Sequence, residues 1–210
     1  MIDRRAFLAG LGALTPAVAV RAAAATYVSE PTWKGSTFLT QSIQAHRTKV
    51  DGVNLIAFRG SRRFGDWWLD FQAAPHAVIG HDDVGRVHAG FLEAAQSIAP
   101  TIAADIGDEP YVPIGHSLGG ALALLVPILM PRRPIAIFGY APPRVYADQV
   151  PPWIVDLTEA LRFGNDPVTD QPLTFPHVPV YPVGRSINPP TDCHHIENYV
   201  SAVIGTAIAA

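Results

Sequence analysis

The feature of this sequence that restricts its fold most is a glycine-rich pentapeptide, Gly115-His116-Ser117-Leu118-Gly119, between two apolar stretches. The preceding stretch, 111–114, is typical of a short buried strand, and the following one, 118–130, is typical of an apolar helix. Glycines on both sides of Ser117 allow a very tight turn without Cβ clashes. The pattern therefore predicts a strand, a sharp turn and a helix, with the Ser117 hydroxyl projecting above a sheet.

Strand-like and helix-like stretches alternate along the rest of the chain. This alternation predicts an α/β fold with a mainly parallel central sheet and helices on both faces. No repeat or low-complexity linker divides residues 26–210, so we expect one domain there. The other expected strands are 37–47 and 49–58 around the turn at 51–52, 135–140, one within 154–163, and 178–183; the other expected helices are 90–106 and 197–210.

Composition excludes several classes of protein. With 49% hydrophobic and 16% charged residues, the chain is globular and not disordered. A net charge of −3, with no basic stripe beyond the N-terminus, argues against a nucleic-acid partner. A single cysteine, Cys193, rules out a disulfide within the chain.

The first 25 residues have the layout of an export signal. Arg4-Arg5 precedes an apolar run over 6–20 and a small-residue exit over 22–25, which resembles a twin-arginine signal. About 15 apolar residues are too few for a membrane span, which needs roughly 20. We therefore expect residues 1–25 to direct export to the periplasm or outside the cell. The alternative is a cytoplasmic protein that retains this segment as its first helix.

Ser117 is the candidate nucleophile because its predicted turn exposes the hydroxyl. The helix that starts at Leu118 would direct free N–H groups and the positive end of its dipole toward a developing oxyanion. The N–H of Leu118 is the first expected oxyanion donor.

A second apolar strand leads to a family resemblance. At Phe58-Arg59-Gly60-Ser61 the chain resembles the fungal-type, or class 3, triacylglycerol lipases of the α/β-hydrolase superfamily. The resemblance covers about residues 27–199. Four further segments carry it, in the family's order: Val87-His88-Ala89-Gly90-Phe91, Ala141-Pro142-Pro143-Arg144-Val145, Asn165-Asp166-Pro167-Val168 and His194-His195-Ile196-Glu197-Asn198-Tyr199.

The resemblance implies an α/β-hydrolase fold and specific roles for site residues. Ser61 matches the family's second oxyanion donor. Asp166 matches the triad acid, and Asp170 is its competitor. The base is His194, which aligns better with the family's histidine, or its neighbour His195. The chain order Ser, Asp, His agrees with this superfamily.

Other polar residues receive no chemical role. His177 resembles a structural histidine of the family, and Arg59 and Arg144 are expected to brace loops. His81-Asp82-Asp83 with His88 could be drawn as a metal site, but loose groupings in loops are usually solvated. We therefore expect neither a metal nor a cofactor.

Aromatic residues gather in the loop-rich stretch 62–86. In the resembling family this region holds a short lid helix over the active site. Phe64, Trp67 and Trp68 are therefore interpreted either as a mobile apolar lid that meets a lipid–water interface or as ordinary packing under a long loop.

Together these features predict a serine hydrolase that cleaves carboxylic esters of lipids through an acyl-enzyme. The substrate would be a small-molecule or lipid ester. One alternative is a phospholipase A1 or feruloyl-type esterase with the same triad. Another is a lipase-like binding module without activity.

Overall fold

The computed structural model describes residues 14–28, 35–40, 43–60, 75–78, 83–186 and 189–208. The predictions on Arg4-Arg5, Ser61, the aromatic residues at 64–71 and His81-Asp82 lie outside these ranges. The described part contains a seven-stranded sheet in the order β1-β2-β3-β6-β7-β8-β9. Its strands are β1 (Thr37–Leu39), β2 (Gln44–Val50), β3 (Val53–Phe58), β6 (Tyr111–His116), β7 (Ile137–Tyr140), β8 (Thr158–Phe163) and β9 (Val180–Val183).

The sheet is mainly parallel, as the alternation of elements predicts. β1, β2 and β3 form an antiparallel edge, and β3, β6, β7, β8 and β9 pair in parallel. A separate antiparallel pair is formed by β4 (Pro75–Ala77) and β5 (Arg86–His88).

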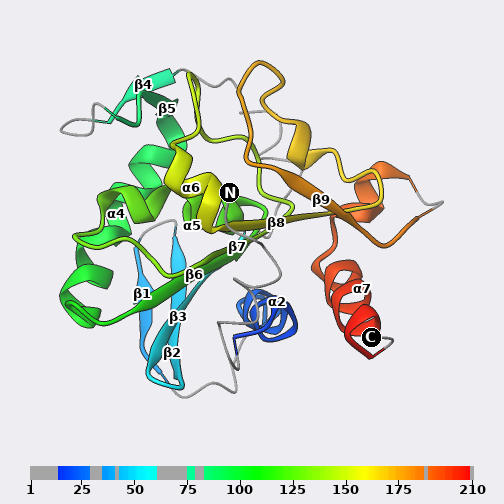
Figure 1. Cartoon of the computed structure of the whole chain (residues 1–210), viewed down its shortest axis with the longest axis horizontal. Helices are drawn as coiled ribbons and strands as arrows, with labels where there is room; N and C mark the ends of the chain where they lie inside the picture. The colour runs from blue at the N-terminus through cyan, green and yellow to red at the C-terminus, as the bar shows by residue number, and fades with distance from the viewer. Residues whose placement is uncertain are drawn as a thin grey trace.

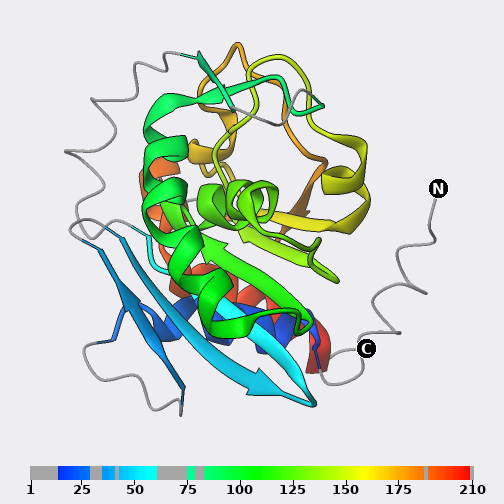
Figure 2. The ribbon, with the colours of Figure 1, turned by 90° about the vertical axis from the view of Figure 1, so that its left-hand side faces the viewer.

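Helices cover both faces of the sheet (Figures 1 and 2). Side chains on β3 alternate between two cores: Ile56 and Phe58 belong to one, Leu55 and Ala57 to the other. The first core includes helices α4 (Ala89–Ile106) and α5 (Leu118–Leu129); the second includes α2 (Pro16–Ala25) and α7 (Ile196–Ile208). None of the described helices is long and apolar enough to cross a membrane.

One predicted element differs from the structure, and another is preceded by a helix that was not expected. The single strand expected at 37–47 is wrong: β1 ends at Leu39 and β2 begins at Gln44. Between these ends the Thr40 hydroxyl accepts from the Ile43 N–H at 3.0 Å, and the Thr40 N–H donates to the Ile43 carbonyl at 2.9 Å. The strand expected within 154–163 is confirmed as β8, and the residues before it belong to a helix, α6 (Pro152–Leu157), which begins at a proline. Short apolar runs do not distinguish a buried helical turn from a strand.

The register of the parallel strands brings their carboxyl ends to one edge. Phe58 of β3 pairs with Gly115 of β6, and His116 of β6 pairs with Tyr140 of β7. Tyr140 pairs in turn with Leu161 of β8. The loops after β3, β6 and β8 therefore emerge together, and this edge is where open α/β sheets place their sites.

Candidate active site

Ser117 occupies the sharp turn between β6 and α5. Its backbone has φ 60° and ψ −126°, a strained conformation for a residue with a Cβ. The turn is fixed by a hydrogen bond from the Ser117 N–H to the Tyr140 carbonyl at 2.9 Å. Gly119 allows the new helix to approach β3, since a Cβ there would collide with the Phe58 carbonyl. The predicted strand, turn and helix are therefore present.

The structure brings Ser117, His194 and Asp166 together from three separate segments. His194 Nε2 lies 2.9 Å from Ser117 Oγ, and His194 Nδ1 lies 2.9 Å from Asp166 Oδ2. His194 ends the short helix η2 (Pro190–His194), and Asp166 follows β8. Exposed fractions of 3%, 8% and 0% for Ser117, His194 and Asp166 show that the group is shielded from water. This geometry allows the imidazole to take a proton from the serine while the carboxylate orients it.

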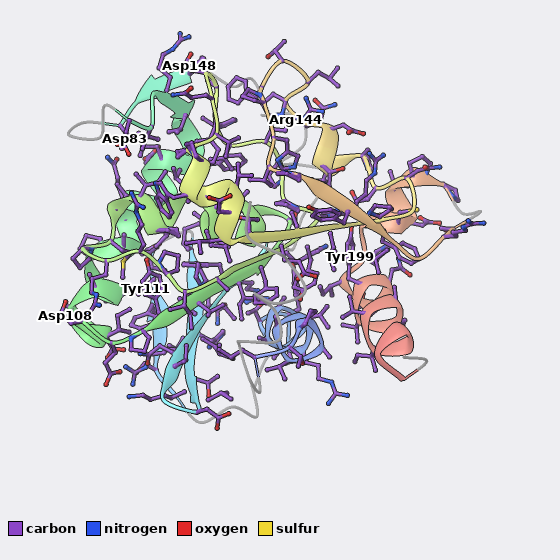
Figure 3. The ribbon with its side chains drawn as sticks, viewed as in Figure 1. Asp83, Asp108, Tyr111, Arg144, Asp148 and Tyr199 are labelled. Atoms are coloured by element: carbon purple, nitrogen blue, oxygen red, sulfur yellow. The ribbon has the colours of Figure 1, made fainter. Side chains whose placement is uncertain are left out.

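Asp166 is held by two donors besides His194. The Val168 N–H donates to Asp166 Oδ1 at 3.0 Å, and the Tyr199 hydroxyl donates to Oδ2 at 2.7 Å. Tyr199 itself accepts from the Phe163 N–H at 3.0 Å. Burial, with the Asp166 charge, raises the pKa of Tyr199 well above its ordinary value, so this donor stays protonated. Figure 3 shows Tyr199 on α7 facing the sheet.

The competing acid and base lie elsewhere. Asp170 pairs with the Arg162 guanidinium, with Nη1–Oδ2 at 3.1 Å, and lies 3.7 Å from Arg144 Nη2. His195 is exposed, whereas its neighbour His194 is buried. Of the two histidines His194 is the one that contacts Ser117, and of the two carboxylates Asp166 is the one that contacts His194.

The predicted oxyanion donors are only partly described. Leu118 opens α5, and its N–H donates to no other group within the described ranges, so it is available to a ligand oxygen. Ser61, the second predicted donor, and the predicted lid lie outside those ranges.

His177 and Arg144 make the structural contacts expected of them. His177 donates to the Pro142 carbonyl at 3.0 Å and accepts from the Val178 N–H at 3.0 Å. Burial lowers the pKa of His177 to about 4, so its ring is neutral at pH 7. Arg144 donates to the carbonyls of Leu173 at 2.9 Å and Phe175 at 3.0 Å and braces the loop after the acid.

A hollow of about 520 Å³ lies beside the acid loop, lined by Arg144, Arg162, Asp170 and His177 among others. No member of the Ser117 group lines it. In the described ranges, no cluster of three or more His, Cys, Asp or Glu residues could hold a metal ion.

Sequence reasoning missed three aromatic groups around the serine. Tyr199 lies in the segment 194–199 that resembles the family, and His116 lies in the pentapeptide 115–119. Neither received a role from the sequence. Tyr27 stood at the start of the resemblance. Their sequence signal is weak because each acts through a contact distant in the chain: Tyr199 meets Asp166, and Tyr27 Oη lies 2.7 Å from His116 Nδ1.

Comparison with known proteins agrees with this geometry. A family model described as "Lipase (class 3)" matches residues 55–175, more than half of the chain. The chain is 29% identical over 130 residues to the "Secreted mono- and diacylglycerol lipase 1" of Fusarium solani; the match covers 56% of this chain and 39% of that protein. The chain matches less than half the length of its curated relatives.

Solved structures of lipases share the fold. The Rhizomucor miehei triacylglyceride lipase superposes with a TM-score of 0.61 at 21% identity, over 80% of this chain and 77% of that chain. A structure from a family of fungal lipases superposes with a TM-score of 0.65 at 20% identity, over 80% and 78% of the two chains. The expected α/β-hydrolase fold is therefore confirmed.

Proposed function

The chain belongs to the class 3 lipase family, and from this premise we propose that it is a serine hydrolase that cleaves carboxylic esters of lipids. The Fusarium solani relative is named as a lipase of mono- and diacylglycerols, which supports glycerol esters as the substrate class. The observation that carries the proposal is the 2.9 Å contact of His194 Nε2 with Ser117 Oγ, backed by buried Asp166.

In the proposed reaction, Ser117 Oγ attacks the ester carbonyl carbon and its proton passes to His194 Nε2. The carbonyl electron pair moves to oxygen, where the Leu118 N–H and the proposed donor Ser61 stabilise the charge; one such donor contributes roughly 10²–10³ in rate. Collapse expels the alcohol, which takes the proton from His194. Water then attacks the acyl carbon while His194 takes its proton; the bond between the acyl carbon and Ser117 Oγ breaks, Oγ regains the proton from His194, and the carboxylic acid leaves. No cofactor takes part.

Labelling by a fluorophosphonate probe tests this function. We expect the full chain to be labelled and to hydrolyse p-nitrophenyl esters, and Ser117→Ala to lose both properties. His194→Ala should lose activity by several orders of magnitude, whereas His195→Ala, its exposed neighbour, should keep it. An unlabelled and inactive wild-type protein would favour the binding-module alternative.

The substrate class is tested with ester panels. Preference for glycerol esters over a phospholipid or a feruloyl ester would support a lipase, and the reverse would support the alternatives on the same triad. Activity that rises on addition of an emulsified lipid would support a lid over 62–86 that opens at an interface. A secreted relative and the Arg4-Arg5 pattern support export of this protein as well.

A further inference from the structure

Helix α2 is built into the face of the sheet that lies behind the site. Val20, Ala22 and Ala23 have exposed fractions of 0%. The helix starts at a capping threonine, Thr15, whose side chain accepts from the Val18 N–H. α2 packs beside α7 in the same core (Figure 1). Residues 16–25 therefore behave as an integral element of the fold.

Tyr27, just past the end of α2, reaches the turn that carries the serine. Its hydroxyl lies 2.7 Å from Nδ1 of His116, the residue before Ser117, and its ring meets the imidazole edge-on at 5.7 Å. The phenol oxygen also lies against the backbone of Gly60. A Cβ at position 60 would collide with the phenol oxygen, so only a glycine there leaves room for the Tyr27 hydroxyl. One phenol thus joins the β6 turn to the end of β3, directly before Ser61 in the sequence.

The two partners of the Tyr27–His116 hydrogen bond are both neutral in their environments. Burial raises the pKa of Tyr27, so its hydroxyl keeps its proton. Burial, and next His194, lower the pKa of His116 well below its ordinary value, so the imidazole is neutral. A neutral ring has one unprotonated nitrogen, and we infer that it is Nδ1, which accepts from the phenol 2.7 Å away.

The neutrality of His116 matters because its ring lies beside the proposed base. The ring centroids of His116 and His194 are 4.7 Å apart, with 30° between the planes. Taking the Ser117 proton makes His194 an imidazolium, and a positive charge on His116 at this distance would oppose it. Tyr27 favours the neutral, correctly oriented state of His116 by occupying Nδ1.

We propose that Tyr27 is a positioning residue that holds the Ser117 turn and the Gly60 strand end together, and that residues 15–27 consequently belong to the active protein and are not removed with an export signal. The inference rests on the proposed ester hydrolysis. It moves the end of any removable leader from the expected position near Ala25 to a point before Thr15.

Kinetics of Tyr27→Phe test the positioning role, with Tyr111→Phe as matched control. Tyr111 also donates a phenol hydrogen bond, to the Arg132 carbonyl at 2.9 Å, but at the opposite end of β6 (Figure 3). We expect Tyr27→Phe to lower kcat roughly tenfold with little change in KM, because one directional hydrogen bond is lost from the reacting geometry. Tyr111→Phe should lose a similar amount of thermal stability and keep kcat.

Outcomes that overturn the inference differ from those that overturn the function. If wild type and Tyr111→Phe hydrolyse esters and Tyr27→Phe is equally active, the positioning role is wrong while the function stands. If the wild type is inactive, the function fails, and imidazole ¹⁵N NMR still tests the contact. We expect an unprotonated Nδ1 on His116, and shifted ring signals for His116 and His194 only in Tyr27→Phe. Unshifted signals in that variant overturn the contact.

The mature N-terminus tests the second half of the inference. The full gene is expressed in a host that exports twin-arginine substrates, and the intact mass of the active protein is measured. A mass that includes residues 15–27 agrees with the inference. An active protein that begins at Thr26 overturns it, because α2 would then be absent from a working enzyme.

Discussion

At the scale of single residues, two aspartates of the same loop differ in their surroundings, and this difference identifies the candidate acid. Asp166 and Asp170 are close in sequence, yet one is fully buried against His194 and Tyr199 and the other is shared by two arginines. Asp166 is thereby fixed in place by His194, Val168 and Tyr199. Asp170 instead ties β8 to the loop that Arg144 braces.

Replacing Asp166 and Asp170, one at a time, by asparagine distinguishes the roles of the two carboxylates. Asp166→Asn should lower kcat by about 10⁴, because the amide favours the wrong tautomer of the imidazole. Asp170→Asn should keep kcat within a few-fold and lower the melting temperature. Both are measured with one p-nitrophenyl ester and one thermal melt, and a large loss of kcat in Asp170→Asn alone would exchange the two assignments.

At the scale of elements, close approach of the backbone holds the site in place. The first turn of α5 lies against the end of β3, so that Gly119 meets the Phe58 carbonyl. This contact sets the distance between the helix that offers the Leu118 N–H and the strand that leads to Ser61. A side chain at position 119 would push these two elements apart.

Gly119→Ala is therefore expected to destabilise the protein by about 1–3 kcal/mol or more, as overpacking does, and to lower kcat. The matched control is Gly205→Ala in α7, where an added Cβ meets nothing within 4 Å. That change should be neutral or stabilise by up to about 1 kcal/mol, because alanine favours helix. Urea unfolding of the two variants measures both, and equal free energies of unfolding would contradict the close contact.

At the scale of the whole molecule, buried histidines make stability depend on pH. Burial lowers the pKa of His177 to about 4 and that of His116 well below its ordinary value. An unfolded histidine titrates near 6.5, so below that pH the unfolded chain binds more protons than the folded one. The stabilisation is complete above about pH 6.5 and declines as the pH falls toward 4.

We therefore expect the free energy of unfolding to decrease from pH 7 to pH 4, with His177 contributing at most about 3 kcal/mol of the decrease. His177→Gln, which cannot titrate, should show a shallower decline than wild type, whatever its stability at pH 7. Urea midpoints at several pH values measure this. Parallel curves for the two proteins would show that His177 does not titrate on unfolding.

The sequence by itself determined the elements whose cause is local. The glycines around Ser117, between an apolar strand and an apolar helix, predicted the turn, and the alternation of elements predicted a mainly parallel sheet. The loop carrying Asp166 and the segment carrying His194 were found through their resemblance to segments of the class 3 lipases. Each of these patterns consists of residues that are neighbours in the sequence. The element can therefore be predicted without knowing which residues pack against it.

Where two candidate residues lie close together in the sequence, only the tertiary structure showed which of them contacts the site. It placed His194 inside and His195 outside, and it brought Tyr27 to His116 and Tyr199 to Asp166 from the two ends of the described chain. The physical reason is that these contacts depend on the register of parallel strands and on the packing of α2 beside α7. Both join residues far apart in the chain, and no local pattern encodes them.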